Sequence, residues 1–281
     1  EMLRSLVGSE MCIRDRPVID EENKTITFKV SEDATPEELK TAKKVAEKVL
    51  GHGDKEIEDN TQPNIFSIKE DNFELGGAKS KFRKNIAAIQ TMKIIESEKR
   101  NASPEEQKIM SEYTGWGGLS QAFDSANEKW TDEYAELKNL LTESEYNDAR
   151  SSVLTAFYTP PFIIDSIYSA ISNMGFNGGS ILDPATGTGN FIGKMPLEMH
   201  GNSRIYAVEK DSISGRISRL LYPDANLKVT GFEKTDLPDS FFDVAVGNVP
   251  FGSIYPSDRR YDKYNFAIHD YFFAKALDKV R

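Results

Sequence analysis

The sequence contains few of the residues that build metal centres and disulfides. Its 281 residues include one cysteine, Cys12, and three scattered histidines, His52, His200 and His269. A zinc site needs Cys and His ligands at short spacings, and a disulfide needs a second cysteine. We therefore expect no metal ligands and a reducing, cytoplasmic compartment. The histidines are interpreted as surface or helix-capping residues.

Long apolar runs and clustered positive charge are also scarce. No apolar run approaches the roughly 20 residues that cross a bilayer, and the apolar stretch at the start is too short and too charged for a signal peptide. The net charge of −10 argues against non-specific coating of nucleic acid, because phosphate binding needs clustered Lys and Arg. No membrane partner is expected, and a local basic groove is compatible with this composition.

The chain is expected to divide into four parts. Residues 1–16 are interpreted as a non-native artefact, because SLVGSEMCIRDR resembles a translated sequencing adapter. Residues 17–60 predict a small strand–helix segment with its helix over 36–50, and residues 61–152 predict a helical region. In residues 153–281 short apolar strands alternate with helices, which predicts an α/β fold with βαβ units and a mostly parallel sheet.

The α/β part is expected to start with a helix at two prolines, for which Thr159 is the predicted N-cap. A helix near Phe191–Met199 should follow the first strand of the sheet. The expected strands are Ser180–Leu182, Arg204–Val208, Leu227–Thr230 and Phe242–Val246, and the later helices are Ser212–Leu221 and a segment from Phe266 onward.

In the helical region, apolar side chains recur at helical spacing over Ser80–Arg100. Ser103 and Glu106 have the spacing of a capping box for the next helix. Trp116 is interpreted as a core residue rather than a base-stacking platform. Four basic residues crowd the start of the first helix: Lys79, Lys81, Arg83 and Lys84. They are interpreted as a solvated face, with contact to a DNA backbone as the alternative.

A glycine loop, Asp183-Pro-Ala-Thr-Gly-Thr-Gly-Asn-Phe191, follows the first expected strand and opens a helix. Its glycines let the backbone turn tightly and approach a ligand closely. Glu209 lies 20 residues after Gly189, a spacing at which a carboxylate can accept both hydroxyls of a ribose. The loop lacks both the dinucleotide fingerprint and the Gly-Lys-Ser/Thr of a triphosphate loop, so it suits a ligand without phosphates.

A second motif, Asn248-Val-Pro-Phe251, follows the fourth expected strand. The carboxyl edge of an open parallel sheet is where ligands bind. An Asn side chain and the next backbone carbonyl can accept two hydrogen bonds from an exocyclic amine, and a nearby aromatic ring can stack on its base. This arrangement suits an amine that attacks a methyl donor, since orientation of the lone pair needs no strong base.

These motifs resemble those of the gamma class of DNA adenine-N6 methyltransferases. The glycine loop looks like the cofactor loop of that class, Asn248–Phe251 looks like its Asn-Pro-Pro-Tyr/Phe motif, and Tyr158-Thr-Pro-Pro161 resembles the segment before the cofactor loop, in the order typical of the class. Residues from about 61 to 281 also resemble the methyltransferase part of large helicase–methyltransferase proteins of bacterial conjugative elements and phages. The stretches that carry this resemblance are GGAKSKFRKNIAAI, YTGWGGLSQAF, GFEKTDLPDSFFDVAVGNVPFG and NFAIHDYFFAKALDKVR.

The resemblance implies a Rossmann-like S-adenosylmethionine-dependent methyltransferase fold, preceded by a mainly helical region, that methylates N6 of a flipped adenine in DNA. By this resemblance Asn248 and the carbonyl of Val249 would hold the amine, Pro250 completes the motif, and Phe251 would stack on the base. Partner domains of the same polypeptide, including a helicase, are implied as well.

The resemblance also implies how S-adenosylmethionine is held. Glu209 would bind the ribose, and Glu233 would contact the cofactor's adenine, with Asp236 as a rival for that role. The other positions expected to bind the cofactor are Tyr158, Thr159, Pro160, Asp183, Pro184, Ala185, Gly187, Gly189, Asn190 and Phe191.

Two departures from the class keep other hypotheses open. Val249 replaces the first proline of the motif, so the fixed φ of proline is lost. The sheet is expected to be truncated after its fourth strand, which leaves an exposed edge, and the chain is interpreted as a fragment with little activity alone. The alternatives are an amino-methyltransferase for protein glutamine or RNA, and a non-catalytic cofactor- or DNA-binding module of a mobile-element helicase.

Overall fold

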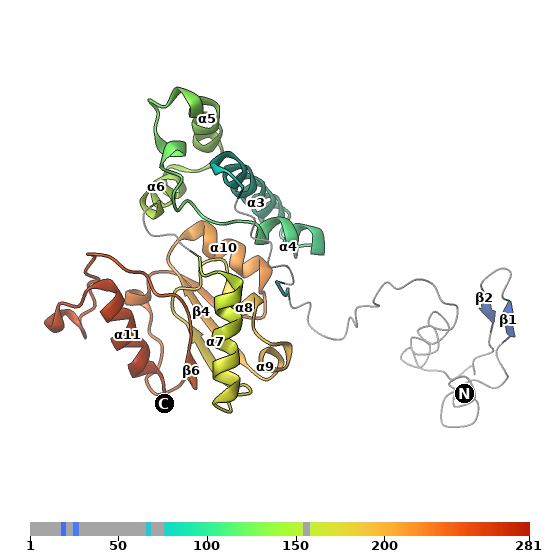
Figure 1. Ribbon diagram of the computed structural model, residues 1–281, viewed down its shortest axis with the longest axis vertical. Coiled ribbons are helices and arrows are strands. Elements are labelled where there is room, and N and C mark those ends of the chain that lie inside the picture. Colours follow the sequence, from blue (N-terminus) through green and yellow to red (C-terminus); the bar gives the residue numbers. More distant parts are fainter. Residues whose placement is uncertain (1–17, 21–24, 28–65, 69–75, 154–157) are drawn as a thin grey trace. The chain divides into compact units, whose positions relative to one another are not determined.

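The protein is described by a computed structural model and divides into two compact units, Glu1–Thr61 and Gln62–Arg281 (Figure 1). In the first unit, β1 (Val18–Asp20) pairs antiparallel with β2 (Thr25–Thr27). The predicted non-native segment and the predicted helix over 36–50 lie outside the described residues, as do Cys12 and His52. The described residues are 18–20, 25–27, 66–68, 76–153 and 158–281.

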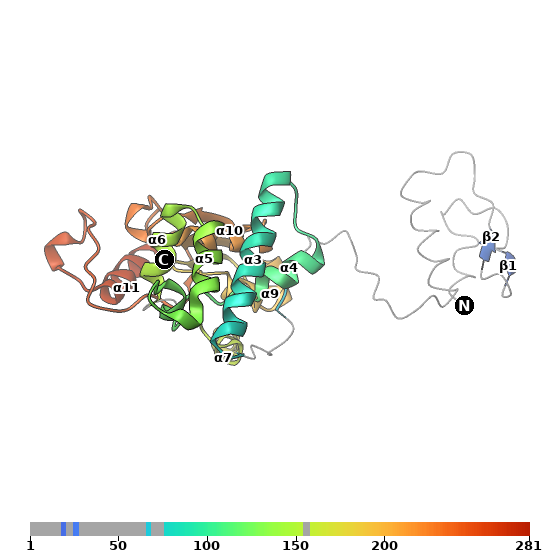
Figure 2. The same ribbon diagram turned by 90° about the horizontal axis from the view of Figure 1, so that it is seen from above.

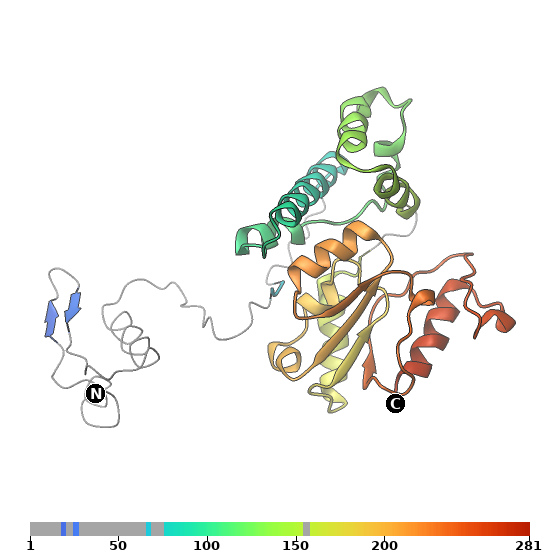
Figure 3. The ribbon, with the colours of Figure 1, turned by 180° about the vertical axis from the view of Figure 1, so that it is seen from behind.

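The second unit contains a four-stranded parallel sheet with the strand order β5-β4-β3-β6. This confirms the α/β, Rossmann-like fold and all four expected strands, with ends that differ by a few residues. Figure 3 shows the strands side by side, with α11 (Ile268–Lys279) beside β6. The strands are β3 (Ser180–Asp183), β4 (Arg204–Glu209), β5 (Asn226–Val229) and β6 (Val244–Ala245).

Both faces of the sheet are buried, because successive side chains of a strand point to opposite faces. Ile181 and Ala207 join one hydrophobic cluster, which includes side chains of α7 (Pro161–Asn173) and α10 (Ser212–Leu221). Their neighbours in the strands join a second cluster with side chains of α11. The residues of this second cluster are Leu182, Val208, Phe232, Leu237, Phe242, Tyr261, Tyr271 and Phe272.

The segment that leads into β6 is paired on its outer side. Phe242 forms a parallel bridge with Val280, and the Arg281 N–H donates to the Phe242 carbonyl at 2.9 Å. The backbone after α11 therefore lies along the residues that precede β6.

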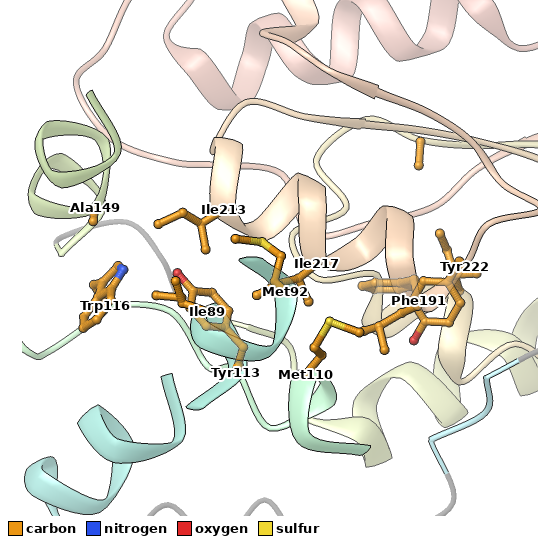
Figure 4. Close-up of a cluster of buried hydrophobic side chains, with 14 of the residues drawn as sticks. Ile89, Met92, Met110, Tyr113, Trp116, Ala149, Phe191, Ile213, Ile217 and Tyr222 are labelled. Carbon is orange, nitrogen blue, oxygen red and sulfur yellow. The ribbon is translucent and has the colours of Figure 1, made fainter. Parts of the chain in front are cut away.

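The helical region and the sheet share one core. Helix α3 contacts α4, α5 and α10 (Figures 1 and 2), and Figure 4 shows side chains of α3, α4 and α10 in one buried cluster. The expected helix over Ser80–Arg100 is confirmed, and so is the capping box of Ser103 and Glu106. The helices are α3 (Ala78–Glu98), α4 (Pro104–Ser111), α5 (Thr131–Leu140) and α6 (Glu143–Ser152).

Trp116 is 1% exposed, and its ring meets that of Phe123 edge-on at 5.4 Å, which confirms its interpretation as a core residue. A charged contact adds to the apolar one: Arg216 of α10 pairs with Glu96 of α3 and Glu145 of α6. An arginine with two carboxylate partners from different helices fixes α10 against the helical region.

The basic residues at the start of α3 bind groups within the protein. Lys79 and Arg83 both pair with Glu133, and the Lys81 ammonium donates to the Gly117 carbonyl at 2.7 Å. Lys84 lies 3.8 Å from a carboxylate oxygen of Glu112. These intramolecular partners favour the solvated, ion-paired interpretation over contact with a DNA backbone.

Three details differ from the sequence-based expectations. Thr159 does not cap α7: the N-cap is Pro160, and no side chain caps it. The helix expected near Phe191–Met199 consists of α8 (Asn190–Gly193) and α9 (Leu197–Gly201), since Pro196 cannot continue a helix from the preceding turn. His200 is 4% exposed and 3.6 Å from Asp224, so its interpretation as a surface residue is wrong.

Short 3₁₀ turns join several of these elements. In the part of the chain that the structure describes, each helix is too short or too polar to cross a membrane. The 3₁₀ turns are η1 (Ser120–Phe123), η2 (Glu128–Trp130), η3 (Phe232–Lys234) and η4 (Asp262–Tyr264).

Candidate functional site

The polar residues singled out from the sequence follow the carboxyl ends of four parallel strands. Glu233 follows β5, Glu209 ends β4, Asp183 ends β3, and Asn248 follows β6. Because the strand order is β5-β4-β3-β6, these residues occupy one edge of the sheet in that order. This is the edge at which open α/β sheets bind ligands.

The glycine loop is a tight turn that closes on β4. The Thr186 N–H donates to the Val208 carbonyl at 3.0 Å. Gly187 and Gly189 have φ angles of 57° and 85°, a region that favours glycine. A Cβ on Gly187 would overlap the ring of Tyr158, and a Cβ on Gly189 would overlap another tyrosine ring. In this structure the glycines therefore serve the turn and its packing against aromatic rings.

Glu209 holds the glycine loop through backbone hydrogen bonds. Its two carboxylate oxygens accept from the N–H groups of Gly187 and Asp211, each at 2.7 Å. Desolvation by burial raises the pKa of Glu209 to about 7, despite these hydrogen bonds. Each carboxylate oxygen has a second lone pair, so further donors such as hydroxyls can still be accepted.

Asp183 is a buried carboxylate that is only partly satisfied. It is 2% exposed, one oxygen accepts from the Ala185 N–H at 3.3 Å, and the other finds no hydrogen-bond partner among the described residues. Burial raises the pKa of this carboxyl to about 7, although the nearby Thr186 hydroxyl and the Ala185 N–H act to lower it. The Thr159 hydroxyl is also buried without a partner within the described structure. Two such polar groups near the sheet edge fit a polar ligand that supplies the missing hydrogen bonds.

The Asn248 segment begins directly against Asp183. The Val246 N–H donates to the Leu182 carbonyl at 2.9 Å, which extends the β3–β6 pairing to the end of both strands. A Cβ built on Gly247 would lie 2.5 Å from a carboxylate oxygen of Asp183. The backbone that enters Asn248 therefore passes within van der Waals contact of the carboxylate that ends β3.

Beyond Gly247 the motif turns outward. Asn248 is exposed and Phe251 is 55% exposed. Val249 packs against the second hydrophobic cluster, and Pro250 is half-buried. Asn248 and Phe251 therefore lie at the surface, while Val249 attaches the segment to the fold.

Other expected cofactor residues are placed within the fold. Phe191 is 5% exposed and packs on Tyr168, and the side-chain amide oxygen of Asn190 accepts from the Thr188 hydroxyl at 3.2 Å. The Tyr158 hydroxyl lies 3.0 Å from that of Ser214 at the start of α10. Pro184 is buried, Ala185 is half-buried, and Pro160 is exposed.

Glu233 lies at a separate pocket of about 410 Å³, whose lining contains none of the glycine-loop residues. It shares this pocket with Asp258 and Lys275, two residues that the sequence analysis missed. A sequence signal for Lys275 exists, because it lies four residues after Tyr271 on the buried side of an amphipathic helix. The rival Asp236 is exposed and bonded to Lys228 at 2.9 Å.

Two of the solved structures that match this chain are described as methyltransferases. A Listeria monocytogenes protein assigned to the class I S-adenosylmethionine-dependent methyltransferases matches with a TM-score of 0.40 and 16% identity, over 72% of this chain and 71% of that one. The methyltransferase subunit of a type I restriction-modification system from Streptococcus thermophilus matches with a TM-score of 0.36 and 11% identity, over 72% and 65%. Both TM-scores are low, so the fold description rests on the strand order and the helix layers.

Sequence comparison with curated proteins finds a similar phage protein. Defense against restriction protein B of Escherichia phage P1 is 33% identical over 133 residues, which are 46% of this chain and 6% of that protein. The chain thus corresponds to a small part of this relative's length. No protein-family model matches the chain.

Proposed function

We propose that this chain is part of an S-adenosylmethionine-dependent methyltransferase that modifies N6 of adenine in DNA. The observation that carries the proposal is the contact between the backbone at Gly247 and the carboxylate of Asp183. It brings the candidate amine-binding segment to the candidate cofactor loop at one sheet edge, as transfer of a methyl group between two bound molecules requires.

The residues present fit the cofactor. S-adenosylmethionine supplies a methyl group on a positively charged sulfonium, next to an amino acid and a ribose. The unpartnered oxygen of Asp183 and the hydroxyl of Thr159 can bond its amino acid end. Glu209 has spare lone pairs for the ribose hydroxyls. In this proposal Glu233 is the candidate contact for the adenine of the cofactor.

The Asn248 segment would orient the acceptor amine. The side-chain oxygen of Asn248 and the carbonyl of Val249 would each accept a hydrogen bond from one N–H group of the amine. The lone pair of the amine would then face the methyl group. Phe251 stacks on the base after it has left the duplex. Packing of Val249 against the second cluster supplies a restraint in place of the missing proline ring.

DNA as the substrate is the finer part of the proposal. The matched phage protein is named for defense against restriction, and chemical modification of DNA is an activity in keeping with that name. Because the match spans 6% of that protein, the proposal extends to a longer polypeptide with further domains. A helicase among these domains is proposed from the resemblance of the sequence motifs alone. Glutamine side chains in proteins and bases in RNA are the competing acceptors with the same amine chemistry.

Incubation with labelled S-adenosylmethionine tests the proposal. The chain, and a longer polypeptide that contains it, would be offered adenine-containing DNA, RNA and protein, and the labelled product would be identified. We expect N6-methyladenine in DNA, with a much higher yield from the longer polypeptide. Cofactor binding by calorimetry without transfer to any acceptor would reject the enzyme in favour of a non-catalytic binding module.

A further inference from the structure

Helix α11 carries a buried lysine whose side chain joins two separate loops. Lys275 is 3% exposed, and an ammonium group has three N–H donors to satisfy. These donors meet the Phe232 carbonyl at 2.8 Å, the Asp258 carboxylate at 2.9 Å and, at a longer 3.4 Å, the Thr235 carbonyl. The ammonium therefore has an acceptor for each of its donors without water.

The first of these loops carries the candidate cofactor residue. Phe232 and Thr235 lie on either side of Glu233 in and after η3, the turn that follows β5. The ring of Phe232 also lies under the ammonium, with its centroid 5.0 Å away. Lys275 thus fixes the backbone on both sides of Glu233.

The second loop runs from the Asn248 motif back to α11. Asp258 receives a second hydrogen bond, from the Tyr271 hydroxyl at 2.7 Å, on the oxygen that also binds Lys275. Desolvation by burial would raise the pKa of Asp258, but the hydrogen bonds from Tyr271, Lys275 and the Arg260 N–H, with the charge of Lys275, together lower it. Nearer the motif, the Ile268 N–H donates to the Ile254 carbonyl at 2.8 Å. The loop is therefore attached to α11 at both of these points. Closer to α11, Tyr261 and Arg260 add further contacts, each at 2.7 Å from a carboxylate oxygen of Asp278.

We propose that Lys275 is a positioning residue that couples the Glu233 turn to the loop after Asn248. This inference rests on the proposed function, because it assigns the first loop to the cofactor and the second to the acceptor amine. Burial of an ammonium group costs more than burial of an apolar side chain, so stability alone does not account for a lysine here. One rigid donor group with acceptors in both loops keeps their separation constant.

The decisive variant is Lys275→Met, with Lys279→Met as its control. Lys279 lies on the same helix, is 6% exposed and pairs with Asp239 at 2.6 Å, but bonds neither η3 nor Asp258. Both substitutions remove a buried ammonium group of α11 that pairs with a carboxylate, so a general loss of stability would affect both alike. Hydrogen exchange in the full chain would be measured over residues 231–236 and 249–258.

We expect Lys275→Met to raise exchange in both segments together and Lys279→Met to leave both unchanged. Tyr271→Phe, which removes one hydroxyl, should loosen only the segment 249–258. Equal exchange in the two lysine variants would overturn the proposal, as would loosening of only one segment by Lys275→Met. If Lys275→Met does not fold, Tyr271→Phe still decides, because unchanged exchange over 249–258 would contradict the inferred attachment.

Activity provides a second readout. In the polypeptide that transfers methyl groups, Lys275→Met should slow single-turnover transfer roughly 10-fold or more and weaken cofactor binding several-fold, because small displacements of positioned groups cost large factors in rate. Lys279→Met should change neither by more than about 2-fold. Absence of transfer by the unsubstituted protein would reject the proposed function, while the exchange experiment would still test the coupling of the two loops.

Discussion

The two halves of the candidate site differ in how completely the fold encloses them. On the glycine-loop half, Asp183 is 2% exposed and Glu209 bonds two backbone N–H groups. On the other half, Phe251 is 55% exposed and Asn248 is exposed. A small charged ligand benefits from a site built in advance by the core, whereas a base that arrives on a large polymer needs an open approach.

The difference also follows the two hydrophobic clusters. The glycine loop packs through Phe191 into the large cluster that includes the helical region, and its Ala185 also touches the smaller cluster. The segment at Val249 packs into the smaller cluster with α11. Substitutions in each half should therefore separate cofactor binding from methyl transfer.

The largest effect is expected at Asn248. Asn248→Ala removes an acceptor for the substrate amine and should lower the rate of methyl transfer about 10³-fold, with cofactor affinity changed less than about 3-fold. Single-turnover assays and calorimetry measure the two quantities. Asn226→Ala is the control: Asn226 is the first residue of β5, at the end of the strand away from the candidate site, so this variant should keep full activity. Comparable losses of affinity and rate in Asn248→Ala would mean that the two halves are not separate.

Gly247→Ala should affect both halves at once. The new Cβ would lie 2.5 Å from the Asp183 carboxylate, so either this side chain or the two segments must shift. We expect cofactor affinity and transfer rate each to fall roughly 10- to 100-fold. Gly201→Ala, whose Cβ meets open space, is the matched control. An effect on the rate without any effect on cofactor affinity would contradict contact between the halves.

The buried carboxylate predicts a pH-dependent stability. The pKa of Asp183 is about 7 in the folded protein against an ordinary 3.8, so between these values the folded state binds more protons than the unfolded state. The free energy of unfolding therefore falls as the pH rises through this window, and the penalty is complete above about pH 7. Asp183→Asn should be more stable than the unsubstituted protein by roughly 2 kcal/mol at pH 8, with little difference near pH 4.

Denaturant unfolding at pH 4.5, 6 and 8 measures this difference. Asp236→Asn is the control, because Asp236 is exposed and its pKa is lowered, so its ionisation does not change in this range. A stability difference for Asp183→Asn that stays constant with pH would show that the carboxyl is ionised throughout.

The smallest effect is expected at the start of α3. Arg83 pairs with Glu133 and Glu136, so Arg83→Ala should cost about 0.5 kcal/mol of stability and change DNA affinity less than 2-fold. DNA titrations at several salt concentrations measure the affinity. If the slope of log affinity against log salt concentration becomes smaller by about one in Arg83→Ala, Arg83 contacts a DNA phosphate instead.

Several features could be predicted because they depend on local patterns. The helix over Ser80–Arg100 and the capping box at Ser103 follow from side-chain spacing. The burial of Trp116 was foreseen as well. Features that depend on distant partners were not foreseen: the buried Lys275 needs acceptors 17 and 43 residues away along the chain. The buried His200 belongs to the same group, whereas at the start of α7 the predicted N-cap, Thr159, was one residue too early.

The sequence alone determined the strands, their alternation with helices and the order of the two motifs, because hydrophobic periodicity and turn residues act over short distances. Tertiary structure decided which groups meet. The strand order brings Asp183 and Gly247 together, although 64 positions separate them in the chain. Tertiary packing also placed the glycines of the loop against tyrosine rings and raised the pKa values of Asp183 and Glu209 by burial. It paired the basic residues of α3 with groups inside the protein. Burial and pairing depend on the whole fold, so no single segment encodes them.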